Sequence, residues 1–242
     1  MTERTLAGTV WGVFSPILIY YLLAMSFPQI LGRLAGNLLL AENAMWLLAA
    51  SNACMLPVFA WMYRQERSFR GLLWESESSR TGGDCLEEGS QRHRGRKFGV
   101  LDFFLVILGA VCISQVMNRL IGLTPLPQYF PGYQTVSSEI YSCSLFSQVA
   151  ASVVSAGLLE ETLMRGLVYN RLKGFTHNCR FSLIGSALIF GIFHGNVVQG
   201  LFAFMMGLLF AWIYETYHSL IPAIVAHMAV NGAAIFCEYM SL

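Results

Sequence analysis

Long apolar blocks with few charged residues dominate this chain of 242 residues. A transmembrane helix needs about 20 mostly apolar residues, and several blocks of that length cannot be hidden in one soluble core. Only 12% of the residues are charged, against about 25% in an ordinary soluble domain. The sequence therefore predicts an all-α fold, a polytopic membrane helix bundle with about seven or eight transmembrane helices. The candidate spans are roughly 7–27, 44–63, 99–118, 145–169, 181–199, 200–217 and 219–239.

The segments between these blocks suggest how the chain is organised. Residues 64–98 interleave basic and acidic side chains among frequent Ser and Gly, which is typical of a solvated loop. We interpret residues 1–140 as N-terminal membrane helices with this charged loop, and residues 141–242 as the membrane helix bundle that carries the chemistry. Residues 28–43 look like a short semi-apolar connection. The proline-rich stretch 119–144 is predicted to be irregular.

The basic residues between the spans predict an orientation, because cytoplasmic loops carry an excess of Lys and Arg. With seven spans, the N-terminus shares a side with the loops after the second, fourth and sixth spans. That side holds most of the basic residues, whereas the opposite side holds Arg33 and Arg119. We expect a multi-pass integral membrane protein with a cytoplasmic N-terminus, in the plasma (inner) membrane if the protein is bacterial.

The net charge and the cysteine spacing argue against two kinds of site, a nucleic-acid surface and a zinc-thiolate site. The formal net charge is +1, and the membrane blocks leave little room for the basic surface that nucleic acid would need. We therefore expect membrane lipid and a protein or peptide substrate as partners, and no nucleic acid. The six cysteines form no C-x-x-C pair, so we interpret them as small membrane-core side chains rather than a zinc-thiolate site.

Ionisable and strongly polar residues gather in three of the last four spans. Each charged group at the centre of a membrane costs at least about 2.5–3.5 kcal/mol, so such residues need a reason. The set comprises Glu160, Glu161 and Arg165 in one span, His194 in the next, and His227 and Asn231 in the last. At ~1.5 Å per helical residue, the four positions Glu160, His194, His227 and Asn231 fall in one layer of the bundle.

Helical spacing places several of these side chains on shared helix faces, where they can interact. Glu161 and Arg165 are four positions apart and can form an ion pair on one helix face. Glu160 points about 100° away around the helix, so one glutamate can face the site while the other faces its arginine. His227 and Asn231 project from one face of the last span.

The chemistry of this set points to amide hydrolysis, which needs an activated water and a site for the oxyanion. Glu160 with His194 could bind and deprotonate a water, and His227 with Asn231 could stabilise the oxyanion. Glu160, His194 and His227 could instead ligate a divalent metal such as zinc, with water in the open position. No cofactor is certain from the sequence, and the H-E-x-x-H motif of ordinary zinc proteases is absent from it.

The order and spacing of these residues resemble the CAAX prenyl endopeptidase family and its bacterial relatives, the CPBP group of intramembrane proteases. The family's motifs E-E-x-x-x-R, F-x-x-x-H and H-x-x-x-N are matched at 160–165, 190–194 and 227–231. The resemblance covers roughly 145–235. It implies a bundle of about eight helices with a cone-shaped cavity open to lipid.

The resemblance also implies a role for each residue. Glu160 would be the catalytic base aided by His194, and His227 with Asn231 would stabilise the oxyanion. Glu161 and Arg165 would support the site. A metal-free glutamate mechanism is implied by the prenyl-protein members of the family, although the family was long described as metalloproteases.

Non-catalytic interpretations stand beside the catalytic one. Each polar residue taken alone fits a structural role, such as a helix-stabilising ion pair or an interhelical hydrogen bond. The whole chain could then be a membrane scaffold, a bacteriocin-immunity-type protein or a transporter. The joint presence of the four site residues favours an intramembrane endopeptidase acting on a membrane-associated, lipid-modified or C-terminally sorted protein.

Overall fold

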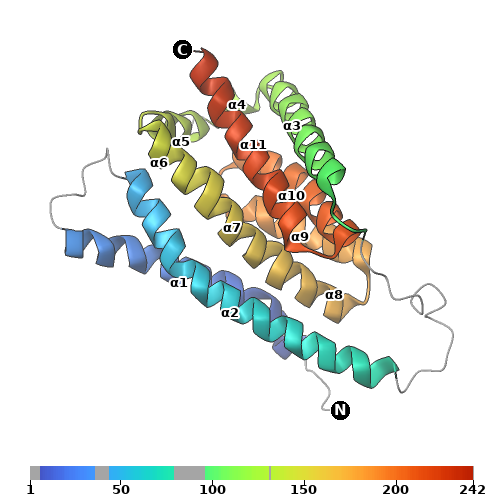
Figure 1. Ribbon diagram of the computed structural model, residues 1–242. Coiled ribbons are helices and arrows are strands. Elements are labelled where there is room, and N and C mark those ends of the chain that lie inside the picture. Colours follow the sequence, from blue (N-terminus) through green and yellow to red (C-terminus); the bar gives the residue numbers. More distant parts are fainter. Residues whose placement is uncertain (1–5, 36–43, 79–95, 131, 242) are drawn as a thin grey trace.

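The computed structural model describes residues 6–35, 44–78, 96–130 and 132–241. Within these ranges the chain forms helices and no strand, which confirms the predicted all-α class (Figure 1). The elements are α1 (Leu6–Ala35), α2 (Ala44–Ser78), α3 (Val100–Gly122), α4 (Leu126–Tyr129), α5 (Gly132–Tyr141), α6 (Leu145–Gln148), η3 (Val149–Ser155), α7 (Ala156–Glu161), η4 (Thr162–Tyr169), α8 (Asn170–Thr176), α9 (Cys179–Phe193), α10 (Val197–Tyr217) and α11 (Leu220–Ser241).

The elements from α6 to α8 form one continuous helical rod at the centre of the bundle. Helices α1 and α2 pack along one side of this rod, and α11 packs along another (Figure 1). The α9 and α10 pair contacts its second half, and α3 lies outside α10 and α11. The rod carries both glutamates. Helices α9 and α11, which lead to His194 and carry His227 and Asn231, both pack against it.

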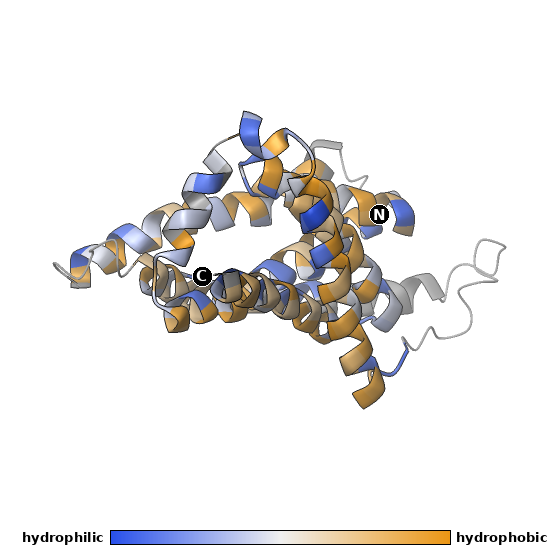
Figure 2. Cartoon of the chain, turned by 90° about the horizontal axis from the view of Figure 1, so that it is seen from above, coloured by the Kyte–Doolittle hydropathy of each residue, from blue (hydrophilic) through white to orange (hydrophobic). Residues whose placement is uncertain are grey.

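Five helices of the described chain are long and apolar enough to cross a membrane: α1, α2, α3, α10 and α11. Figure 2 shows how apolar residues, in orange, run along the helices of the bundle. Many large apolar side chains are exposed, among them Trp11, Phe104 and Trp212, as expected for helices that face lipid. The chain is therefore an integral membrane helix bundle.

Three predicted connections are more helical than the sequence indicated. Helix α2 continues through Ser78, so the first part of the expected loop 64–98 is helical. Residues 79–95 lie outside the described residues, and 96–98 form a non-helical connection to α3. Helix α1 runs through Pro28 to Ala35, and residues 36–43 are likewise outside the described part. The stretch 119–144 contains α4 and α5 rather than an irregular chain. Its prolines at 125 and 127 stand at the start of α4, where a missing N–H costs nothing.

The central rod is unusual because two π-helical segments, η3 and η4, flank α7. The wider turns of a π-helix leave its hydrogen bonds less regular, and such turns occur often at functional sites. Side chains supplement the backbone bonds on both segments. Asn170 donates to the carbonyls of Arg165 and Gly166 at 2.9 and 2.8 Å, and Asn231 donates to that of Ser152 at 2.7 Å. Helix α7, which carries both glutamates, therefore lies between two π-helical segments, η3 and η4, whose backbones side chains help to hold.

A tight reversal joins α9 to α10 and corrects the predicted position of His194. The sequence placed His194 inside a span over 181–199, but α9 ends at Phe193 and His194 caps it. The chain turns at Gly195, whose φ of +65° favours glycine, and Asn196 caps the start of α10. The apolar composition of 181–199 is continuous, so it hid this break. Helix α9 therefore ends six residues before the predicted span 181–199 does, and α10 begins three residues before the predicted span 200–217.

Two glycines allow α9 and α10 to touch near this turn. A Cβ added at Gly191 would lie 2.7 Å from the Gly200 carbonyl oxygen, and one at Gly200 would lie 2.8 Å from the Gly191 oxygen. Small residues at such crossings let membrane helices approach closely. These backbones could not give way without moving the turn that carries His194.

We therefore expect Gly191→Ala to destabilise the protein by about 1–3 kcal/mol, the usual cost of overpacking. The measurement is thermal or denaturant unfolding of the purified protein in detergent micelles. Gly109→Ala is the matched control, because no atom lies within 4 Å of its added Cβ. Equal stability of the two variants would contradict the close packing of α9 on α10.

Candidate active site

Glu161 and Arg165 form a fully buried ion pair on the central rod. Both side chains have an exposed fraction of 0%, and Nη1 of Arg165 donates to Oε1 of Glu161 at 2.8 Å. The second guanidinium nitrogen, Nη2, donates to the carbonyl of Gly207 at 3.0 Å. The pair predicted from the four-residue spacing is confirmed, and α10 contributes to holding it in place.

Two aromatic rings enclose the Arg165 guanidinium. Its Cζ atom lies 4.8 Å from the ring centre of Phe190 and 5.3 Å from that of Phe210. A desolvated cation over an aromatic face is stabilised by the ring quadrupole. The buried positive charge is therefore balanced by one carboxylate, one carbonyl and two rings.

His227 lies between the two glutamates. Its Nδ1 atom is 2.7 Å from Oε1 of Glu161, and its Nε2 atom is 3.8 Å from Oε2 of Glu160. The imidazole stacks on Phe210, with ring centres 4.9 Å apart and planes at 18°. A hydrogen bond at one nitrogen and a stacked ring together fix the direction of the other nitrogen, toward Glu160.

The two adjacent glutamates have different environments. Glu161 is completely buried among fixed partners, whereas 17% of the Glu160 side chain is exposed. Adjacent residues on a helix point about 100° apart, which predicts that one glutamate faces its arginine and the other faces the site. Glu160 is thus the carboxylate that a substrate or a water can reach.

His194 is held from the α9 side. Its Nδ1 atom lies 2.9 Å from the carbonyl oxygen of Phe190, and a carbonyl only accepts, so Nδ1 carries the proton. In the neutral ring this leaves Nε2 as the acceptor. The Phe190 ring contacts both imidazoles, at 4.8 Å for His194 and 5.9 Å for His227. Phe190, the first residue of the F-x-x-x-H motif, thus separates the two histidines.

Asn231 is engaged with the central rod. Its Nδ2 atom donates to the carbonyl of Ser152 in η3 at 2.7 Å. A carboxamide nitrogen has two hydrogens, so one N–H is committed to this bond and the other is available. Asn231 and His227 lie one turn apart on α11, as expected.

The described residues contain no group of three or more His, Cys, Asp or Glu side chains close enough to hold a metal ion. Glu160 and His227 approach each other, but the proposed third ligand, His194, does not join them in such a group. The Oε1 atom of Glu161 is engaged, because it accepts from both Arg165 and His227, whereas its Oε2 atom has no hydrogen-bond partner among the described residues. The metal set of Glu160, His194 and His227 therefore stays a prediction.

Sequence reasoning missed several residues that hold the site. Phe210 stacks on His227, and the Gly207 carbonyl binds Arg165. The two lie three positions apart on one face of α10, but an apolar helix gives no sign of which face meets the site. The Ser152 carbonyl was equally hidden, since backbone acceptors cannot be recognised from residue type.

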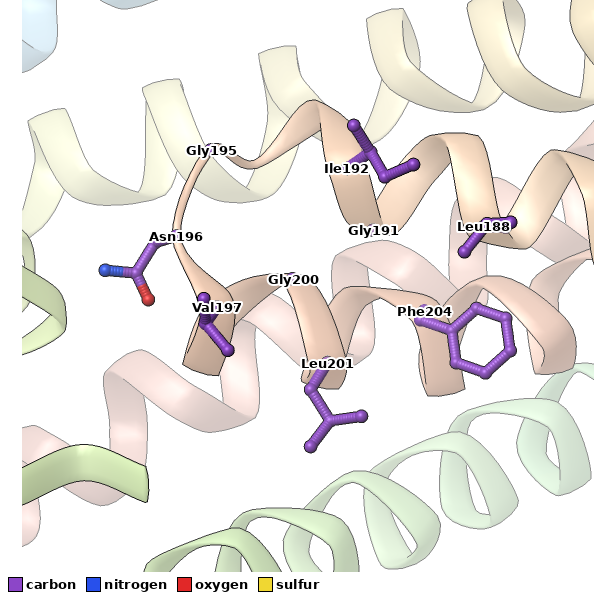
Figure 3. Close-up of a pocket in the computed structure, with 9 residues that line it drawn as sticks. All are labelled: Leu188, Gly191, Ile192, Gly195, Asn196, Val197, Gly200, Leu201 and Phe204. Atoms are coloured by element: carbon purple, nitrogen blue, oxygen red, sulfur yellow. The ribbon is translucent and has the colours of Figure 1, made fainter. Parts of the chain in front are cut away.

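An apolar groove opens beside the turn that carries His194 (Figure 3). Its volume is about 490 Å³. Its walls come from the end of α9 and the start of α10, and Leu201 and Phe204 project from one helix face in the close-up. The groove is lined by Leu188, Gly191, Ile192, Gly195, Asn196, Val197, Gly200, Leu201 and Phe204.

Comparison with known proteins identifies the segment that holds the site. Residues 142–233 match the family model described as Type II CAAX prenyl endopeptidase Rce1-like. Neither a curated protein nor a solved structure matches the chain. The matched segment contains all three motifs and every site residue described above, so the family indicated by the sequence is confirmed. Residues 142–233 are thus similar to the Rce1-like type II CAAX prenyl endopeptidase family, as their three motifs indicate.

Proposed function

We propose that this protein is a CAAX-type intramembrane endopeptidase that hydrolyses a peptide bond with a water activated by Glu160. The observation that carries the proposal is the position of His227 between the two glutamates. Its Nδ1 atom lies 2.7 Å from Oε1 of Glu161, and its Nε2 atom lies 3.8 Å from Oε2 of Glu160. A buried carboxylate and arginine fix one side of this imidazole. The accessible carboxylate lies on the other side, where a reacting group can be placed.

The proposed reaction begins with a water between Glu160 and Nε2 of His194. Glu160 takes a proton from the water as its oxygen attacks the amide carbonyl carbon, which produces a tetrahedral oxyanion. The C–N bond then breaks, and the proton passes from Glu160 to the leaving amine. Water is consumed, one carboxyl and one amino group are formed, and Glu160 regains its initial state.

His227 and Asn231 are the proposed donors to the oxyanion. Nδ1 of His227 lies 2.7 Å from Oε1 of Glu161, so Nε2 is directed to the Glu160 side, where it would donate to the oxyanion. The second N–H of Asn231 would be the other donor. Donors fixed before the reaction stabilise developing charge without reorganisation.

The substrate class we propose is a membrane-associated protein, lipid-modified or sorted by its C-terminus. The apolar groove beside the His194 turn supports this, because an acyl or prenyl chain could lie there while the peptide enters the site. The outer face of the bundle is apolar, as expected for a protein that meets its substrate in the membrane.

We further propose that the N-terminus is cytoplasmic. Contacts bring the predicted cytoplasmic segments together, since Arg171 binds both Glu66 near the end of the second span and the Gly12 carbonyl near the start of the first. At the end of α10, the amide of Arg96 donates to the carbonyl of Thr216. Basic residues gather on this shared side, as the positive-inside rule expects.

The test compares membrane-protein fragments in cells that produce the wild type, Glu160→Ala or His194→Ala. Catalysis predicts that an uncleaved precursor accumulates in both variants while each variant still inserts into the membrane. Identical fragments in all three would favour a non-catalytic scaffold, an immunity-type protein or a transporter. Repeating the cleavage in vesicles with a chelator tests the zinc alternative, since the residue-based mechanism predicts an unchanged rate.

A further inference from the structure

Helix α1 reaches the site although it lies outside the matched segment. Tyr21 of α1 donates its hydroxyl hydrogen to the carbonyl oxygen of Phe193 at 3.1 Å. That oxygen belongs to the peptide group that joins Phe193 to His194. The last carbonyls of a helix lack intrahelical partners, and in a membrane an unsatisfied carbonyl costs several kcal/mol. Tyr21 therefore binds the backbone directly before the histidine.

The ring of Phe193 is held by the same helix. Its centre lies 4.6 Å from that of Tyr20 and 5.3 Å from that of Tyr21. Tyr20 also contacts Phe59 of α2, at 6.3 Å, and Phe59 is completely buried. Adjacent residues on a helix point about 100° apart, so the two tyrosines hold Phe193 from two directions.

The same helix also contacts the rod that carries both glutamates. Helix α1 packs on this rod along η4, the segment that directly follows Glu161. Through this packing and through Tyr21, α1 thus contacts the rod that carries Glu160 and the turn that carries His194. The N-terminal helices are then part of the catalytic unit and not a separate anchor.

We propose that Tyr21 is a positioning residue for His194, acting through the Tyr21 hydroxyl and the Phe193 carbonyl. The inference rests on the proposed function for its catalytic consequence, but its structural part does not. His194 follows Phe193 directly and is held in the turn by bonds from its own amide to Gly191 and from Gly195 to Ile192, at 3.3 and 3.1 Å. Releasing the Phe193 carbonyl loosens this turn.

Tyr21→Phe tests the inference, because it removes the hydroxyl and keeps the ring that packs on Phe193. We expect kcat for the cleaved substrate to fall by about tenfold or more, since a misplacement near 1 Å can cost about 10²-fold. We expect KM to stay the same, and kcat is measured per folded molecule, because the unsatisfied carbonyl also lowers the melting temperature. A loss of general stability alone would leave the kcat of the folded molecules unchanged. Tyr129→Phe, on an exposed side chain, is the matched control with unchanged kcat.

Hydrogen exchange followed by mass spectrometry gives a readout that needs no activity. The amides of His194 and Gly195 should exchange faster in Tyr21→Phe than in the wild type or in Tyr129→Phe. Unchanged exchange in Tyr21→Phe would overturn the inference, and so would an unchanged kcat. If Tyr21→Phe exchanges faster but the wild type cleaves no substrate, the positioning role of Tyr21 stands. The proposed peptidase function is then contradicted.

Discussion

Replacing Glu160 with glutamine is expected to lower the rate of peptide cleavage by about 10²–10⁴-fold, the usual contribution of a general base. Glutamine keeps the shape of the side chain but cannot accept the proton of the attacking water. Because 17% of the Glu160 side chain is exposed and its nearest described partner is an imidazole at 3.8 Å, the variant should fold normally. The measurement is the single-turnover rate in lipid vesicles.

The control for this variant is Glu238→Gln, which changes an exposed carboxylate near the end of α11. It should cleave at the wild-type rate. A Glu160→Gln protein that cleaves within a few fold of the wild type would show that another group activates the water. Equal losses in both variants would show that the assay reports general damage.

Removing Arg165 is expected to have the largest effect on stability. Arg165→Met leaves Glu161 as a buried carboxylate with only His227 beside it, and breaking a buried pair in this way costs about 3–5 kcal/mol. Unfolding in detergent measures the loss. Arg96→Met is the matched control, because Arg96 is 60% exposed in its pair with Asp102 and such pairs contribute about 0–1 kcal/mol.

A double variant separates stability from function in the same network. Replacing both partners, as in Glu161→Leu with Arg165→Met, removes the uncompensated charge and should recover much of the lost stability. It should not recover cleavage, because Nδ1 of His227 then loses the carboxylate 2.7 Å away that orients the ring. A double variant that is stable and fully active would contradict the orienting role of Glu161.

The sequence was most informative where chemistry and helical spacing act together. Glu161 and Arg165 were correctly paired because residues four apart share a helix face, and membrane burial leaves a charge few other partners. The division between an enclosed Glu161 and a reachable Glu160 followed from the same geometry. Five of the seven predicted spans correspond to described helices that are long and apolar enough to cross a membrane, since long apolar blocks permit few other structures in lipid. The predicted span 181–199 is instead divided between α9 and the start of α10.

Features set by tertiary packing could not be predicted in this way. His194 was placed inside a span, but a glycine with positive φ and a capping asparagine end the helix there. Single glycines and asparagines also occur in uninterrupted membrane helices, so they did not signal the turn. The ring of Phe210 behind His227 and the hydroxyl of Tyr21 on the α9 end depend on how distant helices pack, which local patterns do not encode.

The central claim is that Glu160 and His194, from separate helices, act on one water. Single-turnover cleavage by the Glu160→Gln, His194→Gln and double variants in vesicles tests it most directly, with equal melting temperatures as the check on folding. Groups that act as a unit are strongly non-additive, so the double variant should be about as slow as the slower single variant. A double variant slowed by the product of the two single effects would show that the residues act independently and would contradict the claim.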